Sequence, residues 1–418
     1  HDSWFNSQRF TNRLEYDLKL KNDYSIITWV SHSIYQRKKL TYTKDFIDSS
    51  SKLVKDNTSN DTTTSNALNY KFLFGDQGAE KKLTSLSGAD INFEDAIGKR
   101  IVDKQQEMTE YALFSSLIYN PNSRISIQPG FRYSYYTRFK SIPIPSIVMK
   151  WNPNQYLSIR TSYARGYRTP SLKELFIQFK DINHDIRPND SLKSERGHDF
   201  SVSVNLNTDK TDKIHFTNVE LSLFYTQTKD RIYLAPQLDV GTTTFKYINI
   251  SYFNTIGGQL SFKYSFYPNF DFGFGFGTVG TYASLLYSNQ GLSKYKFSSN
   301  VSLNTSYMIP GIGVKVYLNY KFTGLDYNAN LDEKPESAAL DEGIKWSTIE
   351  KYHTIDISFI KKLLSNRLTL TCGVKNLLDN TIVLAKGSSG DNPHTGGDGS
   401  SVGYGRLFFS SLSYNIYK

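Results

Sequence analysis

Hydrophobic and polar residues alternate along most of this chain with a period of two. The pattern is clearest where four phenylalanines at alternate positions, from Phe270 to Phe276, are separated by Asp271 and glycines. It recurs at residues 219–226, where apolar side chains occupy every second position. Because successive side chains of a strand point to opposite faces of a sheet, the alternation predicts strands with one apolar and one polar face.

Short polar turns and long polar loops alternate between these segments. Counting the segments gives about seventeen strands of roughly ten residues, which is the length of a tilted strand that crosses a membrane. Long loops are expected at residues 45–63, 325–347 and 378–400. No apolar run reaches the roughly twenty residues that a transmembrane helix needs.

A further long polar loop joins a strand that ends near Tyr163 to a strand that begins near Ser201. Pro170 and Pro188 lie within it, and we expect them to break any regular element between them. A soluble domain rarely needs so long a connection between paired strands. This central loop is therefore either functional or evidence against the assigned strands.

The composition favours an outer-membrane barrel. Aromatic residues make up 15% of the 418 residues, with 30 Tyr and 27 Phe, although the chain is hydrophilic on average. In such barrels alternate side chains contact lipid and lumen, and girdles of aromatic residues mark both membrane interfaces. The sole cysteine, Cys372, forbids a disulfide within the chain, which is compatible with exposure to the periplasm.

The net charge of +10 does not indicate a nucleic-acid partner. The basic residues are spread over strands and loops and do not cluster with aromatic residues in a recognisable binding module, so they are interpreted as a solvated lumen and rim. The sequence also contains no nucleophile paired with a base, no metal-ligand spacing and no phosphate-binding loop. We therefore expect that the protein is not an enzyme.

Backbone hydrogen bonding determines the predicted architecture. An unpaired amide in hydrocarbon costs several kcal/mol, so strands that cross a bilayer must close into a cylinder. We predict an all-β fold, a transmembrane antiparallel up-and-down β-barrel over residues 1–418, with short turns at the periplasmic rim and long loops outside. The odd strand count, and a start at His1 without an initiator Met or a signal peptide, lead us to expect that the barrel is incomplete at its N-terminus.

The central loop resembles the loop of TonB-dependent outer-membrane receptors that carries two short motif boxes. The first is aromatic-Arg-Ala-Pro and the second is Asn-Pro-Asp/Asn-Leu. The corresponding residues here are Tyr167, Arg168, Thr169 and Pro170 in the first box, and Asn189, Leu192 and Glu195 in an altered second box in which Pro188 precedes Asn189. On this resemblance, residues 163–197 form an extracellular motif-bearing loop within the barrel.

Three other stretches are similar to the same family, namely Gln128 to Tyr133, Gly373 to Asn380 and Gly405 to Ile416. The last resembles the terminal strand that the barrel-insertion machinery reads. Its signal residues would be Phe408, Leu412, Tyr414 and Ile416. The family usually ends on Phe, whereas this chain ends on Ile416, Tyr417 and Lys418.

The resemblance implies a 22-stranded barrel around an N-terminal plug. This chain would be its C-terminal part, and the plug domain would not be in this chain. The implied function is uptake of a scarce nutrient across the outer membrane of a Gram-negative bacterium. The implied partners are the TonB-ExbB-ExbD system, acting through an N-terminal part not present here, the barrel-insertion machinery, outer-membrane lipids and, as in some relatives, a surface lipoprotein.

Haem or haemoprotein iron is the sharpest hypothesis for the cargo. In haem receptors a histidine between the two boxes is proposed as an axial iron ligand, and His184 lies between them here. Neutral imidazole suits iron. The candidate ligand-binding residues are His184, Tyr167, Arg168 and His198, of which Tyr167 and Arg168 are expected to pack and pin the loop.

Other interpretations stay open at this point. His184 is also consistent with an ordinary loop residue. The same receptor class takes cobalamin, ferric siderophores or glycans, and the strand pattern is also compatible with a passive porin or with a soluble β-sandwich or propeller. No cofactor is expected to be built in, since haem would be a transported ligand.

Overall fold

The computed structural model describes residues 2–416 except 46, 49, 56–59, 77–80, 181–184, 209–214, 238–243, 267, 285–294, 332–343, 387–398 and 402. The chain forms two compact units. Unit 1 comprises His1–Met149, Tyr163–His198 and Lys229–Ile250, and unit 2 comprises Lys150–Ser162, Asp199–Thr228 and Ser251–Lys418. Five strands contribute residues to both units: β8 (Pro143–Trp151), β9 (Leu157–Arg168), β12 (Glu195–Asn207), β13 (His215–Gln237) and β14 (Thr244–Phe266).

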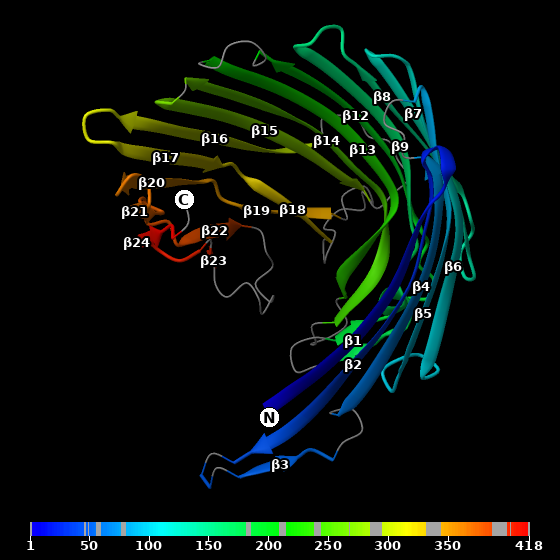
Figure 1. Ribbon diagram of the computed structural model, residues 1–418. Coiled ribbons are helices and arrows are strands. Elements are labelled where there is room, and N and C mark those ends of the chain that lie inside the picture. The colour runs from blue at the N-terminus through cyan, green and yellow to red at the C-terminus, as the bar shows by residue number, and fades with distance from the viewer. Residues whose placement is uncertain are drawn as a thin grey trace. The chain divides into compact units, whose positions relative to one another are not determined.

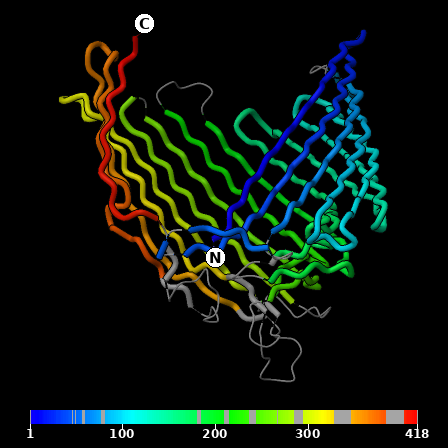
Figure 2. Tube along the Cα trace, turned by 90° about the horizontal axis from the view of Figure 1, so that it is seen from below, coloured from blue at the N-terminus to red at the C-terminus, as the bar shows by residue number. Residues whose placement is uncertain are grey.

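Unit 1 is built on long antiparallel strands that follow one another in chain order. They are β1 (Asp2–Lys19), β2 (Tyr24–Lys44), β4 (Asp61–Asp76), β5 (Leu83–Gly98), β6 (Gln105–Asn122) and β7 (Ile125–Tyr136). Figures 1 and 2 show β1, β2, β4, β5 and β6 side by side, from blue to cyan. A single 3-10 turn, η1 (Lys21–Asp23), closes the first hairpin. Asn22 and Asp23 both take positive φ there, which Asn and Asp tolerate better than most residues.

The two faces of the unit 1 strands differ in chemistry, as the alternation predicted. One row of paired residues crosses six strands and is exposed and apolar or aromatic: Leu14, Val30, Tyr70, Ile91, Tyr111 and Tyr135. The next row, on the opposite face, is polar: Arg13, Ser31, Asn69, Asn92, Glu110 and Tyr136. An exposed apolar band over many strands is the face that a membrane barrel turns toward lipid.

Unit 2 repeats this arrangement. Its long strands pair antiparallel in the order β14, β15 (Phe270–Ser284), β16 (Lys296–Ile309), β17 (Val314–Thr323), β20 (Tyr352–Leu363), β21 (Leu368–Lys375) and β24 (Leu407–Tyr414). One row reads Phe262, Phe274, Leu303, Tyr320 and Ile355, and the next reads Ser261, Gly275, Ser302, Lys321 and Thr354. The phenylalanine stripe therefore lies on one face, as predicted.

Short strands occur inside segments that the sequence predicted as loops. β18 (Asp326–Leu331) pairs with β19 (Ile344–Ile349), β22 (Ile382–Lys386) pairs with β19 and with β23 (Gly399–Ser401), and β3 (Ser51–Leu53) pairs with the end of β2. β4 also begins at Asp61, inside the predicted loop 45–63. The expectation of plain loops was wrong at these places. Neighbouring extended segments satisfy their backbone groups by pairing, even where no apolar alternation marks them.

Among the described residues, seventeen strands have eight residues or more, which agrees with the number predicted from the sequence. The other strands are short. The described part of the chain contains no helix with the length and apolarity to cross a membrane.

Candidate functional site

The central loop begins later and ends earlier than the sequence indicated. β9 continues to Arg168 and β12 already begins at Glu195, so several residues of the predicted loop 163–197 belong to strands. Between Pro170 and Pro188 lie the short helix α1 (Leu172–Phe176) and two short strands, β10 (Phe179–Lys180) and β11 (Asp185–Arg187), which pair with each other. The expectation that the two prolines exclude regular structure between them was wrong.

A capping box explains why a helix forms directly after Pro170. Ser171 is the N-cap, and its hydroxyl accepts a hydrogen bond from the Glu174 backbone N–H at 3.4 Å. In return, the Glu174 carboxylate accepts the Ser171 backbone N–H at 2.7 Å. Pro170 is fully buried. Because it precedes the N-cap Ser171, its ring lies outside the helix and does not interrupt it. The Ser-x-x-Glu spacing in the sequence was the signal for this helix.

The described residues of the segment 169–194, here called the motif loop, pack against the polar face of the unit 1 strands. Its apolar side chains Leu172, Leu175, Phe176 and Leu192 form one buried cluster with Ala96, Ile101, Met108 and Ile232. Ala96 on β5 and Met108 on β6 belong to the face that carries Asn92 and Glu110. Two backbone hydrogen bonds fix the contact, from Val102 N–H to the Phe176 carbonyl at 3.0 Å and from Gln178 N–H to the Arg100 carbonyl at 2.9 Å.

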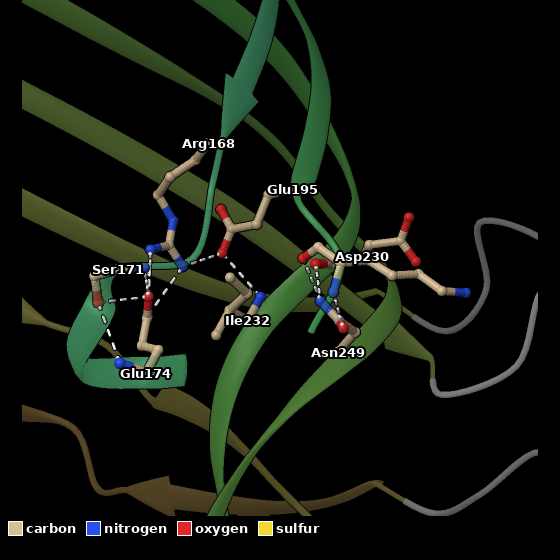
Figure 3. Close-up of polar contacts among 8 residues, drawn as sticks. Arg168, Ser171, Glu174, Glu195, Asp230, Ile232 and Asn249 are labelled. Atoms are coloured by element: carbon tan, nitrogen blue, oxygen red, sulfur yellow. Dashed lines mark hydrogen bonds and ion pairs between the residues drawn. The ribbon is translucent and has the colours of Figure 1, made fainter. Parts of the chain in front are cut away.

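Arg168 joins the two motif boxes. Its guanidinium contacts the Glu174 carboxylate at 3.1 Å and donates to Glu195 Oε1 at 2.6 Å. Figure 3 shows the guanidinium between these carboxylates. The same Glu195 oxygen accepts the backbone N–H of Ile232 at 2.8 Å, so the network also reaches β13. A planar guanidinium with two carboxylate partners is held in a defined orientation.

The second box is anchored by its amide and its leucine. Asn189 accepts hydrogen bonds from Ser191, donates from Nδ2 to the Tyr247 carbonyl at 2.7 Å, and bonds from its backbone N–H to the Glu174 carbonyl at 3.0 Å. Leu192 is only 4% exposed, within the buried cluster. The boxes therefore contact each other although about twenty residues separate them in the sequence.

The four predicted ligand residues lie in different settings. The Tyr167 hydroxyl donates to the Lys140 carbonyl at 2.7 Å and lies 3.0 Å from the Ser194 hydroxyl, and Arg168 is engaged by both glutamates. His198 lies beside Tyr163, with Nδ1 3.0 Å from the phenol oxygen. His184 lies outside the described residues. Within the described part of the chain, no group of three or more metal-ligating side chains occurs.

Three further residues support the loop and were missed by sequence reasoning. Asn249 accepts the Lys193 backbone N–H at 2.8 Å and donates to the carbonyls of Lys193 and Asp230. The Asp230 carboxylate pairs with Arg196 at 3.2 Å. Asn249, Asp230 and Ile232 lie on β13 and β14, outside both boxes, and nothing in their local sequence indicates these contacts.

The predicted barrel-insertion residues lie at the C-terminal edge. Phe408, Leu412 and Tyr414 alternate along β24 and Ile416 follows it, and all four side chains are more than half exposed. They share the face of Leu370 and Val374 on the neighbouring strand. Their role as an insertion signal stays a prediction.

Glu174 makes the docking of the motif loop sensitive to acid. Burial raises the pKa of its carboxyl group, but the hydrogen bonds from Ser171 and Arg168 outweigh burial and hold the pKa below its usual 4.5. A carboxylate with a lowered pKa stabilises the folded loop fully above its ordinary pKa, and this contribution is lost as the pH falls through the lowered value. We expect hydrogen exchange at Val102 and Gln178, corrected for intrinsic rates, to speed up below about pH 4.5.

Glu174→Gln provides the matched control, because its amide cannot ionise. At neutral pH we expect faster exchange than in the parent protein, and a weaker response to acid. If the parent protein and Glu174→Gln respond equally to acid, Glu174 does not carry the effect.

Strands with one exposed apolar face and one polar face are typical of the transmembrane β-barrels of outer membranes. The chain belongs to the family described as TonB dependent receptor-like, beta-barrel, whose model matches residues 1–377. This family assignment replaces the alternative interpretations of the sequence as a soluble β-sandwich, a propeller or a passive porin. Proteins of this family are receptors and not enzymes.

Solved structures share the fold. The chain is similar to the siderophore receptor PirA from Acinetobacter baumannii (TM-score 0.67, 14% identity, 98% of this chain and 62% of that chain). It is also similar to the ferric enterobactin receptor PfeA from Pseudomonas aeruginosa (TM-score 0.68, 13% identity, 98% of this chain and 62% of that chain). A third similar structure is the outer membrane transporter YddB from Escherichia coli (TM-score 0.66, 14% identity, 99% of this chain and 63% of that chain). The chain thus spans less than two thirds of the length of these proteins.

One curated relative matches over a short stretch. A "Hemoglobin and hemoglobin-haptoglobin-binding protein" of Haemophilus ducreyi is 33% identical over 90 residues, which is 22% of this chain and 9% of the relative.

Proposed function

We propose that this chain is the barrel part of a TonB-dependent receptor that takes up haem, or iron from a haemoprotein. The observation that carries the proposal is the double anchoring of the motif loop by Arg168, Glu174 and Glu195, with His184 in the segment between the anchored boxes. The local similarity to a haemoglobin-binding protein supports the same cargo. In this proposal His184 is an axial ligand to the haem iron.

The proposed energy source is the TonB-ExbB-ExbD system of the inner membrane. Family membership supports this partner, which would act on a plug in the complete receptor. The motif loop would present the cargo to that plug, because it packs on the polar face of the strands and not on the apolar face. We further propose that the barrel-insertion machinery recognises β24. A surface lipoprotein is a further proposed partner, as in some relatives.

The test uses a complete receptor that contains this chain. We expect His184→Ala to weaken haem binding by at least about tenfold and to change the Soret spectrum of bound haem. We also expect a deletion strain that carries the variant to grow poorly with haem as its only iron source.

His215→Ala is the matched control. His215 lies at the start of β13 and packs beside Tyr264 and Phe266, away from the motif loop in the sequence. The His215→Ala variant should leave the affinity for haem and the Soret spectrum of bound haem unchanged. An unaltered Soret spectrum in His184→Ala would show that His184 is not a ligand to the haem iron. Full growth on haem of a deletion strain that carries no copy of the receptor would overturn the uptake function itself.

A further inference from the structure

A cavity of about 470 Å³ lies in unit 1, between the polar face of the first strands and the motif loop. Its wall is made by β1, β2 and the start of β4, by the turn between β5 and β6, and by residues 173–179 and Ile186 of the motif loop. The lining side chains that matter here are Phe5, Tyr35, Arg37, Arg100, Lys173 and Phe179. A volume of this size suits a small-molecule ligand.

The lining is strongly basic. Among the described lining residues, Arg37, Lys39, Arg100 and Lys173 are basic and Asp61 is acidic. Asp61 lies 3.6 Å from Arg100 and is thereby engaged. Beside the paired Arg100 and Asp61, the cations Arg37 and Lys173 lie on walls of low dielectric constant and give the described lining a positive potential that attracts an anion.

Aromatic rings hold the arginines in place. The Arg37 guanidinium carbon lies 4.3 Å from the centre of the Phe5 ring and 5.8 Å from that of Phe179, and the Arg100 guanidinium carbon lies 5.9 Å from the centre of the Phe179 ring. Such contacts fix the plane of a guanidinium and leave its N–H edge to donate in that plane. Tyr35 and the two phenylalanines add a surface on which a flat ring system can lie.

We propose that this cavity binds the anionic edge of a ligand that carries flat unsaturated rings. The shared chemistry is two or more anionic oxygens attached to such rings, either the side-chain carboxylates of haem or the catecholates of a ferric siderophore. Arg37 and Lys173 donate to the ionised oxygens, and Phe5 and Phe179 pack against the ring system. The proposal rests on the proposed uptake function and assigns to it a binding subsite distinct from His184.

The test compares haem with its dimethyl ester, which has the same ring and iron but no free carboxylates. We measure the dissociation constants of both for a complete receptor and for its Arg37→Gln/Lys173→Gln variant. In the parent protein haem should bind about tenfold or more tightly than the ester. In the variant the affinity for haem should fall by about tenfold and that for the ester should stay the same, so that the preference disappears.

Arg13→Gln is the matched control. Arg13 lies on the same face of β1 as Phe5 and stacks on Trp29, but it does not line the cavity. It should keep the preference for free carboxylates. If the double variant keeps that preference while haem still binds, the cavity proposal is overturned and the uptake function stands.

A ferric tris-catecholate complex distinguishes the two sources of the anion. If the parent protein binds this complex and not haem, and the double variant binds it about tenfold more weakly, the cavity assignment stands and the haem function fails. If the double variant binds both anions as the parent protein does, or if the parent protein binds neither, the cavity assignment is wrong.

Discussion

Leu175→Ala is expected to release α1 from the strand wall and to destabilise the docked motif loop by about 2–4 kcal/mol. The Leu175 side chain is only 2% exposed and belongs to the buried cluster of the loop. Truncation removes its apolar contacts and leaves a cavity beneath α1. Hydrogen exchange at Val102 and Gln178, the two amides that bond across the contact, measures the release directly.

Lys173→Ala is the control for this prediction. Lys173 lies on the same helix with an exposed side chain, so its truncation should leave the exchange of both amides nearly unchanged. Equal protection in the parent protein and in Leu175→Ala would mean that the cluster does not hold the loop.

Leu318→Arg is the second change for which we expect a large effect, because it places a charge on the apolar face of β17. Leu318 is 38% exposed and pairs with Thr305 and Ile357. An arginine on the lipid face near the bilayer midplane costs about 2–4 kcal/mol. Reversible urea unfolding in lipid vesicles should show that the free energy of unfolding of the variant is lower by this amount.

The neighbouring position gives a matched control. Asn319 is also exposed but lies on the polar face, between Asn304 and Asp356. Asn319→Arg adds the same charge beside a carboxylate, and we expect little change in the free energy of unfolding. Equal losses in both variants would show that the two faces do not differ in environment.

The strand framework could be predicted from the sequence because every crossing strand must separate an apolar from a polar face. The run from Phe270 to Phe276 shows this, since its register with β14 places all four rings opposite apolar or aromatic partners. Short strands such as β18 and β19 lack this constraint. Their pairing depends on where the chain returns, which no local pattern encodes.

The candidate site was predictable only in part. The motif boxes identified Arg168, Asn189 and Glu195, and the Ser171 to Glu174 spacing contained a readable helix signal. By contrast, the contact of Glu195 with the Ile232 amide joins residues 37 positions apart. A backbone N–H carries no residue identity, so the sequence could not reveal this contact.

The most direct test asks which face of the strands contacts lipid. In a complete receptor with Cys372→Ser, nitroxide labels are placed at Phe276→Cys and Asn300→Cys, whose backbones lie on adjacent paired strands but whose side chains point to opposite faces. In lipid vesicles, dissolved oxygen should relax the label at 276 more strongly than a water-soluble nickel chelate does, whereas the label at 300 should show no such preference for oxygen. A label at 276 that is shielded from oxygen, or more accessible to nickel, would contradict the barrel.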